Sequence, residues 1–344
     1  MKFGVKLPHS GSLASPEAIQ RIALKAEELA FDSVWVHDHI SYGRDWIGHR
    51  ASGLVEITKD YEPRFYESIV TLSHVAGFTK KIRLGTSILV IPLRNPLVLG
   101  RQVITLQDLS GGRFVLGVGV GDYPGDFKAI TVPYEKRGRI TDEYLEVLRK
   151  VFQGGRISYN GEHVTVDDAH IHHMITPPPI FIGGGVIAMP EPSPDRLNPI
   201  VLRRAARFGD GWMPDWGRPE VIREGVRMLH DLAREYNREQ VPFEVSMDKR
   251  FYIGHSDEEA YEKTKKTLAM AERTANVVAG IGYRSPRRIY ENSLVGSAAS
   301  IIEKIRRLSD VGVGRIIVTC LAADLNSFGE MLTRFDKDIA PAFK

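Results

Sequence analysis

The sequence predicts an α/β fold of the (β/α)8 type, a TIM barrel formed by one domain over residues 1–344. Short apolar runs typical of buried strands alternate with segments of helical length along nearly the whole chain. Eight such strand-like runs can be assigned, which favours a closed barrel over an open sheet. No linker rich in Gly or Ser divides the chain into two units.

Two strands and one helix precede the clearest part of this pattern. Residues 3–7 and 33–36 are apolar runs that we assign to strands one and two. The helix between them, residues 16–30, begins well because a serine precedes it and a proline occupies its first turn. A second helix is expected over residues 62–77, after a long loop.

The clearest part of the pattern follows directly. Residues 82–90 and 114–120 are apolar runs, and the segment between them, 96–109, has the length of a helix. One serine and two glycines at 110–112 end that helix. A strand, a helix and a second strand joined by short connections form a parallel crossover unit, whose strands are buried on both faces.

The second half of the chain continues the alternation with shorter strands. Residues 139–152 repeat apolar side chains near the helical period, and residues 156–166 form a predicted hairpin with Asn160-Gly161 at its turn. The remaining strands are expected at residues 180–182, 211–213, 243–253 and 315–321, and the remaining helices at 198–208, 219–237, 257–274 and 297–309. The longer excursions are 37–61, 122–138, 156–178, 185–197 and 275–296. Most follow the carboxyl end of a strand, where barrel enzymes carry their active sites.

Composition excludes several classes of protein. With 43% hydrophobic and 26% charged residues, the chain has a globular composition. Its formal charge is only +3, and the Lys and Arg residues are interspersed with Asp and Glu, which argues against a nucleic-acid partner. No apolar run approaches the ~20 residues that span a membrane, and the amino terminus has no signal-peptide apolar region, so we expect a cytoplasmic protein. The single cysteine, Cys320, excludes an internal disulfide and a cysteine-cluster zinc site, and we expect a buried thiol.

Six segments occur in an order that resembles a known family. They are VWVHDHI (34–40), KIRLGTSILVIPLRNP (81–96), TLQDLSGGRFVLGVGVGD (105–122), RGRITDEYLEVLRKVF (137–152), PPPIFIGGG (177–185) and AARFGDGWMP (205–214). Together they resemble the luciferase-like flavin-dependent oxidoreductases, which include reduced-FMN monooxygenases and enzymes of the deazaflavin coenzyme F420. The likeness is clear over residues 1–253 and looser over 297–321. It implies a (β/α)8 barrel that holds the cofactor ring across the carboxyl ends of its strands.

The catalytic candidates lie where strands two and four end. His37, Asp38 and His39 end strand two, and His is the side chain most easily tuned to exchange protons near neutral pH. The resemblance implies that His39 transfers a proton or orients substrate and that Asp38 positions the cofactor, whereas His37 fits a hydrogen-bonded strand end. Asp122 takes the place where some F420 enzymes carry a catalytic Glu. It is either a third catalytic residue or a cap of the following turn.

The cofactor-binding candidates are on strands three, four and five. The resemblance implies a non-proline cis peptide bond between Ser87 and Ile88 that supports the cofactor ring from behind. The glycines of Gly117-Val118-Gly119-Val120-Gly121 have the spacing GxGxG, which is not a dinucleotide fingerprint, and we expect them to let the backbone approach a flat ring. Gly183-Gly184-Gly185 exposes successive N–H groups, which predicts a nest for the cofactor phosphate. A flexible loop is the alternative.

The remaining candidates are loop residues. Trp46 resembles an active-site tryptophan of some members, and Arg94 is expected either to hold substrate or cofactor or to fix its own loop. Arg284, Arg287 and Arg288 form a basic excursion that could close over an anionic substrate or the F420 tail. The histidines at 170, 172 and 173 lack the spacing of a metal site, so we expect no metal.

These features predict an oxidoreductase that uses F420 or FMN at the barrel mouth. We favour F420-dependent hydride transfer to or from a small organic substrate, because GTSIL and the Asp38-His39 pair look closer to that branch. A reduced-FMN monooxygenase supplied by a partner flavin reductase and a non-catalytic flavin-binding protein remain open, and an F420 reductase is a further expected partner. A flavin-free barrel enzyme of phosphorylated sugars would want a Schiff-base lysine at a strand end, and we find none. Family members usually form homodimers, and helix 62–77 either mediates this or faces the barrel.

Overall fold

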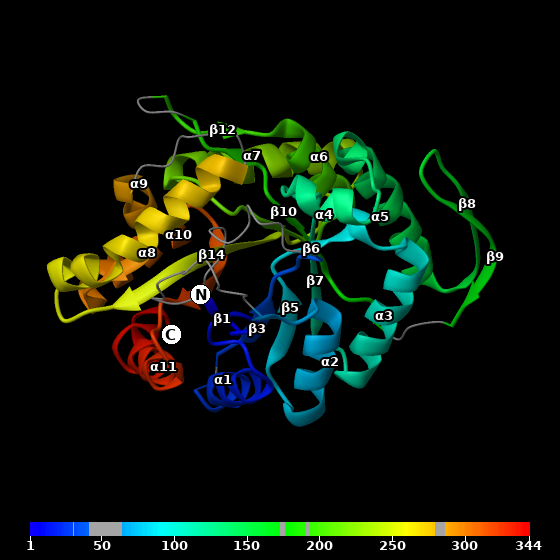
Figure 1. Ribbon diagram of the computed structural model, residues 1–344. Coiled ribbons are helices and arrows are strands. Elements are labelled where there is room, and N and C mark those ends of the chain that lie inside the picture. The colour runs from blue at the N-terminus through cyan, green and yellow to red at the C-terminus, as the bar shows by residue number, and fades with distance from the viewer. Residues whose placement is uncertain (30, 41–63, 173–175, 190–192, 279–285) are drawn as a thin grey trace.

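The computed structural model is a closed barrel of eight parallel strands (Figure 1), and it describes residues 1–29, 31–40, 64–172, 176–189, 193–278 and 286–344. In order around the barrel the strands are β1 (Lys2–Lys6), β3 (Ser33–Val36), β5 (Arg83–Thr86), β7 (Phe114–Gly119), β10 (Ile180–Gly183), β13 (Gly211–Met213), β14 (Glu244–Ile253) and β16 (Val313–Cys320). β16 pairs with both β14 and β1, which closes the ring. The predicted fold class is confirmed.

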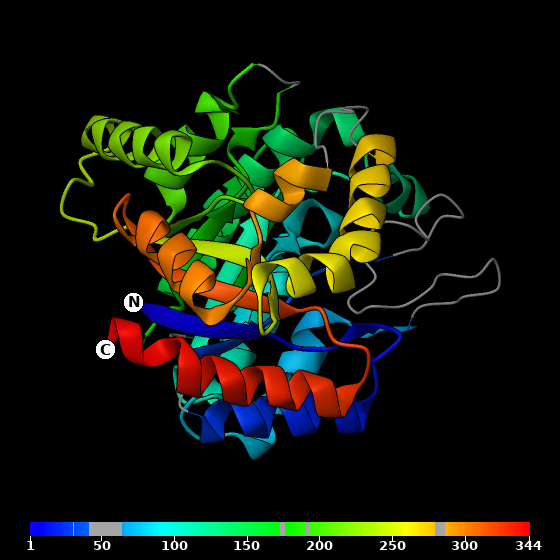
Figure 2. The same cartoon turned by 90° about the vertical axis from the view of Figure 1, so that its left-hand side faces the viewer.

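Helices surround the barrel on all sides in Figure 1. They are α1 (Pro16–Glu28), α2 (Ser68–Phe78), α3 (Pro96–Leu109), α4 (Pro124–Ala129), α5 (Arg137–Gln153), α6 (Pro199–Phe208), α7 (Pro219–Glu235), α8 (Asp257–Val278), α9 (Pro286–Glu291), α10 (Ala298–Ser309) and α11 (Leu325–Asp338). Side chains cap several of them; Ser15 accepts from the N–H of Ala18 at 3.0 Å. α11 packs beside α1, which brings the carboxyl terminus close to the amino terminus (Figure 2).

Short strands and 3-10 helices lie outside the eight-stranded ring. The hairpin of β8 (Gly155–Asn160) and β9 (Thr165–Ile171) projects away from the barrel in Figure 1. Its turn is fixed to α5, because Glu143 accepts hydrogen bonds from the N–H groups of residues 162, 163 and 164 at 3.0, 2.8 and 3.2 Å. The other short strands are β2 (Ser10–Gly11), β4 (Arg64–Phe65), β6 (Leu89–Val90), β11 (Val186–Ile187), β12 (Arg196–Leu197) and β15 (Leu294–Gly296), and the 3-10 helices are η2 (Ile91–Leu93), η3 (Tyr134–Lys136) and η4 (Ala340–Phe343).

The second helix starts later than the sequence pattern predicts. Its first residue is Ser68 rather than residue 62, because the carboxylate of Glu67 caps it by accepting from the N–H of Val70 at 2.7 Å. Its apolar stripe, Ile69, Leu72 and Val75, is buried in the core of the chain. The stripe therefore faces the barrel, which was one of the two expectations for this helix.

Third-strand residues 82–90 do not form one continuous strand. β5 ends at Thr86, a cis peptide bond joins Ser87 to Ile88 as the resemblance predicted, and β6 resumes at Leu89. β6 pairs with the end of β7. This break puts Ser87 and Ile88 at the barrel mouth.

The barrel interior is apolar in the middle and charged at its amino end. Five inward-facing side chains fill the middle: Trp35, Val115, Phe181, Met213 and Ile317. A Cβ at Gly85 would lie 2.3 Å from the Trp35 ring, so this strand glycine provides the room that the indole needs. At the amino end of the barrel, Arg315 is fully buried. Its guanidinium donates to Ser33 and Glu244 at 2.6 Å each and pairs with Asp32. This floor closes the barrel, so a ligand enters only from the other end.

The lone thiol, Cys320, is 2% exposed, and burial raises its pKa above the ordinary value. Only the thiolate is a good nucleophile, so we expect no reaction with a thiol-specific disulfide reagent while the chain is folded. Absorbance of the released chromophore should show one thiol per chain only after addition of guanidinium chloride. Rapid labelling of the native protein would contradict this burial.

In the described ranges no helix is long and apolar enough to cross a membrane.

Candidate active site

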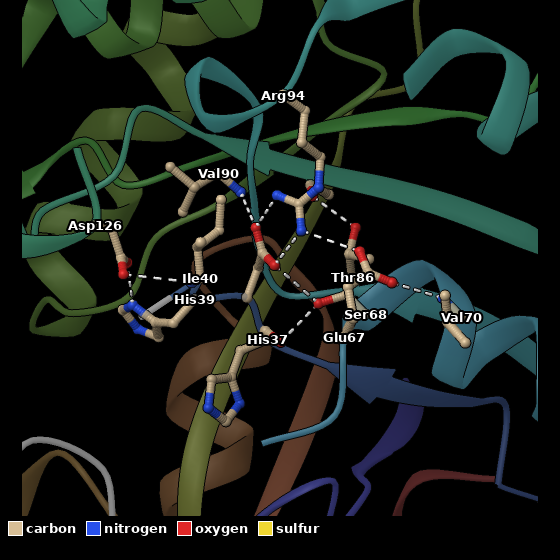
Figure 3. A network of polar contacts seen from close by, with 12 residues as sticks. His37, His39, Ile40, Glu67, Ser68, Val70, Thr86, Val90, Arg94 and Asp126 are labelled. Atoms are coloured by element: carbon tan, nitrogen blue, oxygen red, sulfur yellow. Dashed lines mark hydrogen bonds and ion pairs between the residues drawn. The ribbon is translucent and has the colours of Figure 1, made fainter. Parts of the chain in front are cut away.

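A buried ion pair organises one side of the barrel mouth (Figure 3). Asp38 follows β3, and both of its carboxylate oxygens accept from Arg94, at 2.6 and 2.7 Å. Val90 N and Ser68 Oγ also donate to Asp38, at 2.9 and 3.2 Å, and Arg94 also donates to Glu67 at 3.0 Å. The Asp38 side chain is 0% exposed and that of Arg94 is 13% exposed.

This network defines what Arg94 and Asp38 do in the chain. It ties the end of β3 to the loop after β6 and to the start of α2. The guanidinium of Arg94 bonds to Asp38 and Glu67, which holds the loop after β6 against β3 and α2. Asp38 shapes the mouth through Val90 and Arg94, so it positions the wall of the site.

His39 belongs to a separate buried pair. Its Nδ1 lies 2.8 Å from Asp126 Oδ2, and the N–H of Ile40 donates to Asp126 Oδ1 at 3.3 Å (Figure 3). The two side chains are 3% and 2% exposed. A carboxylate on Nδ1 places the ring proton there and leaves Nε2 as the basic nitrogen. This is the arrangement of an oriented general base.

Asp126 is a residue that the sequence analysis missed. It lies on α4, four positions after Asp122, which had been the carboxylate candidate. Asp122 itself is exposed, and its backbone carbonyl accepts from Tyr134 Oη at 3.1 Å. The structure thus pairs Asp126 with His39 and puts Asp122 in the turn before α4.

Two further histidines pack behind the pair. The rings of His9 and His37 are edge to face at 4.4 Å, and Phe65 lies 5.1 Å from His37 and 5.9 Å from His39. Nδ1 of His9 lies 3.1 Å from the carbonyl of Leu7, and its Nε2 lies 2.9 Å from the carbonyl of His37. His37 is therefore a hydrogen-bonded strand end, as expected, and His9 is a buried neighbour that sequence reasoning did not select.

The buried His9 makes stability depend on pH. Burial lowers its pKa from 6.5 to about 4, so the unfolded chain binds a proton between these values that the folded chain does not bind. Stability is then full above pH 6.5 and falls as the pH drops towards 4, by roughly 3 kcal/mol in total. Urea unfolding of wild type and His9→Gln at pH 7.5 and 5 should show a smaller pH effect in the variant. His230→Gln, on the exposed face of α7, serves as the control, and equal pH effects in all three proteins would contradict this role.

The third-strand break forms a wall of the mouth. Ile88 projects towards β7 and β10: a Cβ at Gly119 would lie 2.0 Å from Ile88 Cδ1, and one at Gly183 would lie 2.6 Å from Ile88 Cγ2. Both glycines provide room for the isoleucine, whereas the sequence analysis expected Gly119 to make room for a flat ring and Gly183 to form part of a phosphate nest. Val120 and Gly121 follow at the end of β7. The Oγ of Ser87 is buried without a hydrogen-bond partner among the described residues.

The glycine triplet at the end of β10 is partly fixed by hydrogen bonds within the fold. Gly184 and Gly185 have positive φ angles of 89° and 100°, which glycine adopts readily. The N–H of Gly184 donates to Met213 O at 3.0 Å, and its carbonyl accepts from Trp212 Nε1 at 2.7 Å. A Cβ at Gly184 would meet no atom within 4 Å, so the triplet borders open space.

Of the four remaining candidates, two lie outside the described residues and two lie on α9. Trp46 and Arg284 lie outside the described residues. Arg287 is 87% exposed in its side chain and pairs with Glu291 on α9, and Arg288 lies on the same helix. In the part of the chain that the structure describes, no group of three His, Cys, Asp or Glu could hold a metal ion.

The chain is similar to known proteins in sequence and in fold. A family model described as luciferase-like monooxygenase matches residues 1–315. The F420-dependent glucose-6-phosphate dehydrogenase of Nakamurella multipartita is 24% identical over 360 aligned positions, which cover 100% of this chain and 97% of that protein.

Two solved structures share the fold. An F420-dependent secondary alcohol dehydrogenase in complex with an F420-acetone adduct has a TM-score of 0.80 and 19% identity over 100% of this chain and 99% of that one. The oxygenating constituent of 3,6-diketocamphane monooxygenase from Pseudomonas putida, in complex with FMN, has a TM-score of 0.71 and 18% identity over 100% and 99% of the two chains.

Proposed function

The chain belongs to the luciferase-like monooxygenase family and is an oxidoreductase with a flavin-type cofactor, and we propose that this cofactor is F420. The proposed reaction is hydride transfer between F420 and a small organic substrate. The observation that carries this proposal is the buried pair of His39 and Asp126 at the barrel mouth. F420-dependent dehydrogenases among the relatives support it.

The His39–Asp126 pair suits the oxidation of an alcohol or its reversal. F420 supplies a ring carbon that takes or gives a hydride. Oxidation of a secondary alcohol to a ketone also releases the hydroxyl proton, which needs a base. His39 takes that proton on Nε2, while Asp126 holds Nδ1–H and stabilises the resulting imidazolium. In the reverse direction the imidazolium returns the proton to the carbonyl oxygen.

The described residues fit a flat ring at this mouth. The buried Oγ of Ser87 has no partner among them and would bond to a bound ring. Ile88 would form the apolar wall behind the ring, with Gly119, Val120 and Gly121 at its edge. The open space beside Gly184 would admit the phosphate, next to Gly183 and Gly185. Asp38 and Arg94 would hold this wall in place through Val90 rather than touch the cofactor.

The same family supports a second candidate, a reduced-FMN monooxygenase supplied by a partner flavin reductase. The likeness to an FMN-bound monooxygenase constituent favours it. A non-catalytic flavin-binding protein is a weaker candidate, because the His39–Asp126 pair would then have no catalytic role.

We further propose that the whole chain forms a single domain and that the protein is a cytoplasmic homodimer. Trp46 and the arginines at 284, 287 and 288 are proposed substrate contacts.

Titration of the protein with F420 and with FMN separates the two main candidates. Quenching of cofactor fluorescence should give a micromolar Kd for F420. Loss of F420 absorbance should then be followed against a panel of secondary alcohols and sugar phosphates, with reduced F420 tested against ketones. Binding of FMN alone, with oxygen consumption when reduced FMN is supplied, would overturn the F420 proposal in favour of a monooxygenase.

A further inference from the structure

Lys6 and Asp248 form an ion pair at the barrel mouth, in addition to the contacts of Asp38 and His39 given above. Lys6 is the last residue of β1, and Asp248 lies on β14. The ammonium of Lys6 also donates to the carbonyl of Ser87 at 3.3 Å. Thr319 on β16 donates to the other carboxylate oxygen of Asp248 at 2.6 Å.

Strand order places this pair inside the barrel. β1 has β16 and β3 as neighbours; β14 lies beyond β16, and Ser87 follows β5, beyond β3. One ammonium group can reach residues two strands away on both sides only by crossing the interior. The side chains are 12% and 27% exposed for Lys6 and Asp248, so they lie just inside the mouth, beside the wall at Ser87 and Ile88.

Charges in this position are weakly screened. A partly buried unit charge acts over several ångströms with an energy that bulk water would largely remove. Reduction of a flavin-type ring by two electrons and one proton leaves it with one negative charge, and charge near the ring is how a protein tunes its electronics. A cation and an anion at the mouth should therefore act on the reduced ring in opposite directions.

We propose that Lys6 and Asp248 together set the preference of this site for the reduced over the oxidised cofactor, Lys6 favouring the reduced ring and Asp248 the oxidised ring. The inference rests on the proposed function only in requiring a flavin-type ring at the mouth. It holds for F420 and FMN alike.

The test compares Lys6→Met with Asp248→Asn. Kd values are measured by fluorescence and absorbance titration, without oxygen, for oxidised and reduced FMN and F420, with dithionite as reductant for FMN and borohydride for F420. Relative to wild type, Lys6→Met should weaken binding of the reduced ring against the oxidised ring about tenfold, or about 30 mV for a two-electron couple. Asp248→Asn should shift the same ratio in the opposite direction.

Three more variants separate charge from structural damage. Lys6→Arg keeps the charge and should keep the wild-type ratio. The double variant Lys6→Met/Asp248→Asn should fall between the two single variants. Lys2→Met is the matched control, because Lys2 and Glu244 pair across the same two strands at the opposite end of the barrel. It should leave the ratio unchanged.

Two results would overturn the proposal. One is a shift of the ratio in the same direction for Lys6→Met and Asp248→Asn, which a merely structural pair would give. The other is a ratio in both variants that matches Lys2→Met. Binding of FMN alone by the wild type would overturn F420 as the cofactor, yet opposite shifts with FMN would still support this inference.

Discussion

Replacement of His39 by Gln should lower kcat about 10²- to 10⁴-fold, the usual contribution of a positioned general acid or base. Gln keeps a polar side chain of similar length but cannot take a proton. Cofactor binding should change little, because the pair acts on the substrate proton. The measurement is steady-state F420 reduction with the alcohol that the substrate panel identifies, together with the Kd for F420.

Asp126→Asn distinguishes proton transfer from simple packing. The amide keeps the shape of the side chain but loses the charge that orients Nδ1–H and stabilises the imidazolium. We expect a smaller loss of kcat than for His39→Gln, because the imidazole itself remains in place. His230→Gln is the control. A kcat for His39→Gln within threefold of wild type would rule out His39 as the proton acceptor.

The barrel could be predicted from the sequence because its strands are short apolar runs between well-marked helices. Helix α3 matches the expected residues 96–109, since Asn95 and the serine and glycines after it mark both ends. Helix α4 was missed because its six residues are too few to show a period. Helix α11 was not assigned from the sequence, although its apolar residues have the helical period and Asp324 forms a capping box. Its buried residues are Phe328, Met331, Leu332 and Phe335.

The candidate site could be predicted only where its residues are neighbours in the chain. Asp38 and His39 stand side by side at a strand end, so their position at the mouth was readable. Their partners were not, because Arg94 and Asp126 lie 56 and 87 positions away. No sequence pattern indicates which carboxylate pairs with His39, and the sequence analysis selected Asp122 instead of Asp126. Consecutive residues thus belong to different networks: Asp38 pairs with Arg94, and His39 pairs with Asp126.

Loss of the Arg94 guanidinium should destabilise the fold by about 3–5 kcal/mol, the usual cost of removing one partner from a buried ion pair. In Arg94→Met the Asp38 carboxylate stays buried and, among the described residues, keeps Val90 N and Ser68 Oγ as partners. An unpaired charge is costly there because its side chain is 0% exposed. Guanidinium chloride unfolding, followed by circular dichroism, measures the change in free energy of unfolding.

Matched variants show whether this loss belongs to the pair. Arg287→Met breaks an exposed ion pair on α9 and should change stability little. In the double variant Arg94→Met/Asp38→Asn no charge is left unpaired, so it should recover part of the loss, and the cycle of single and double variants gives the coupling energy. If Arg94→Met unfolded at the same denaturant concentration as Arg287→Met, the pair would contribute nothing to the fold. Arg94 would then be available to bind substrate or cofactor, which is the alternative role that the sequence analysis gives it.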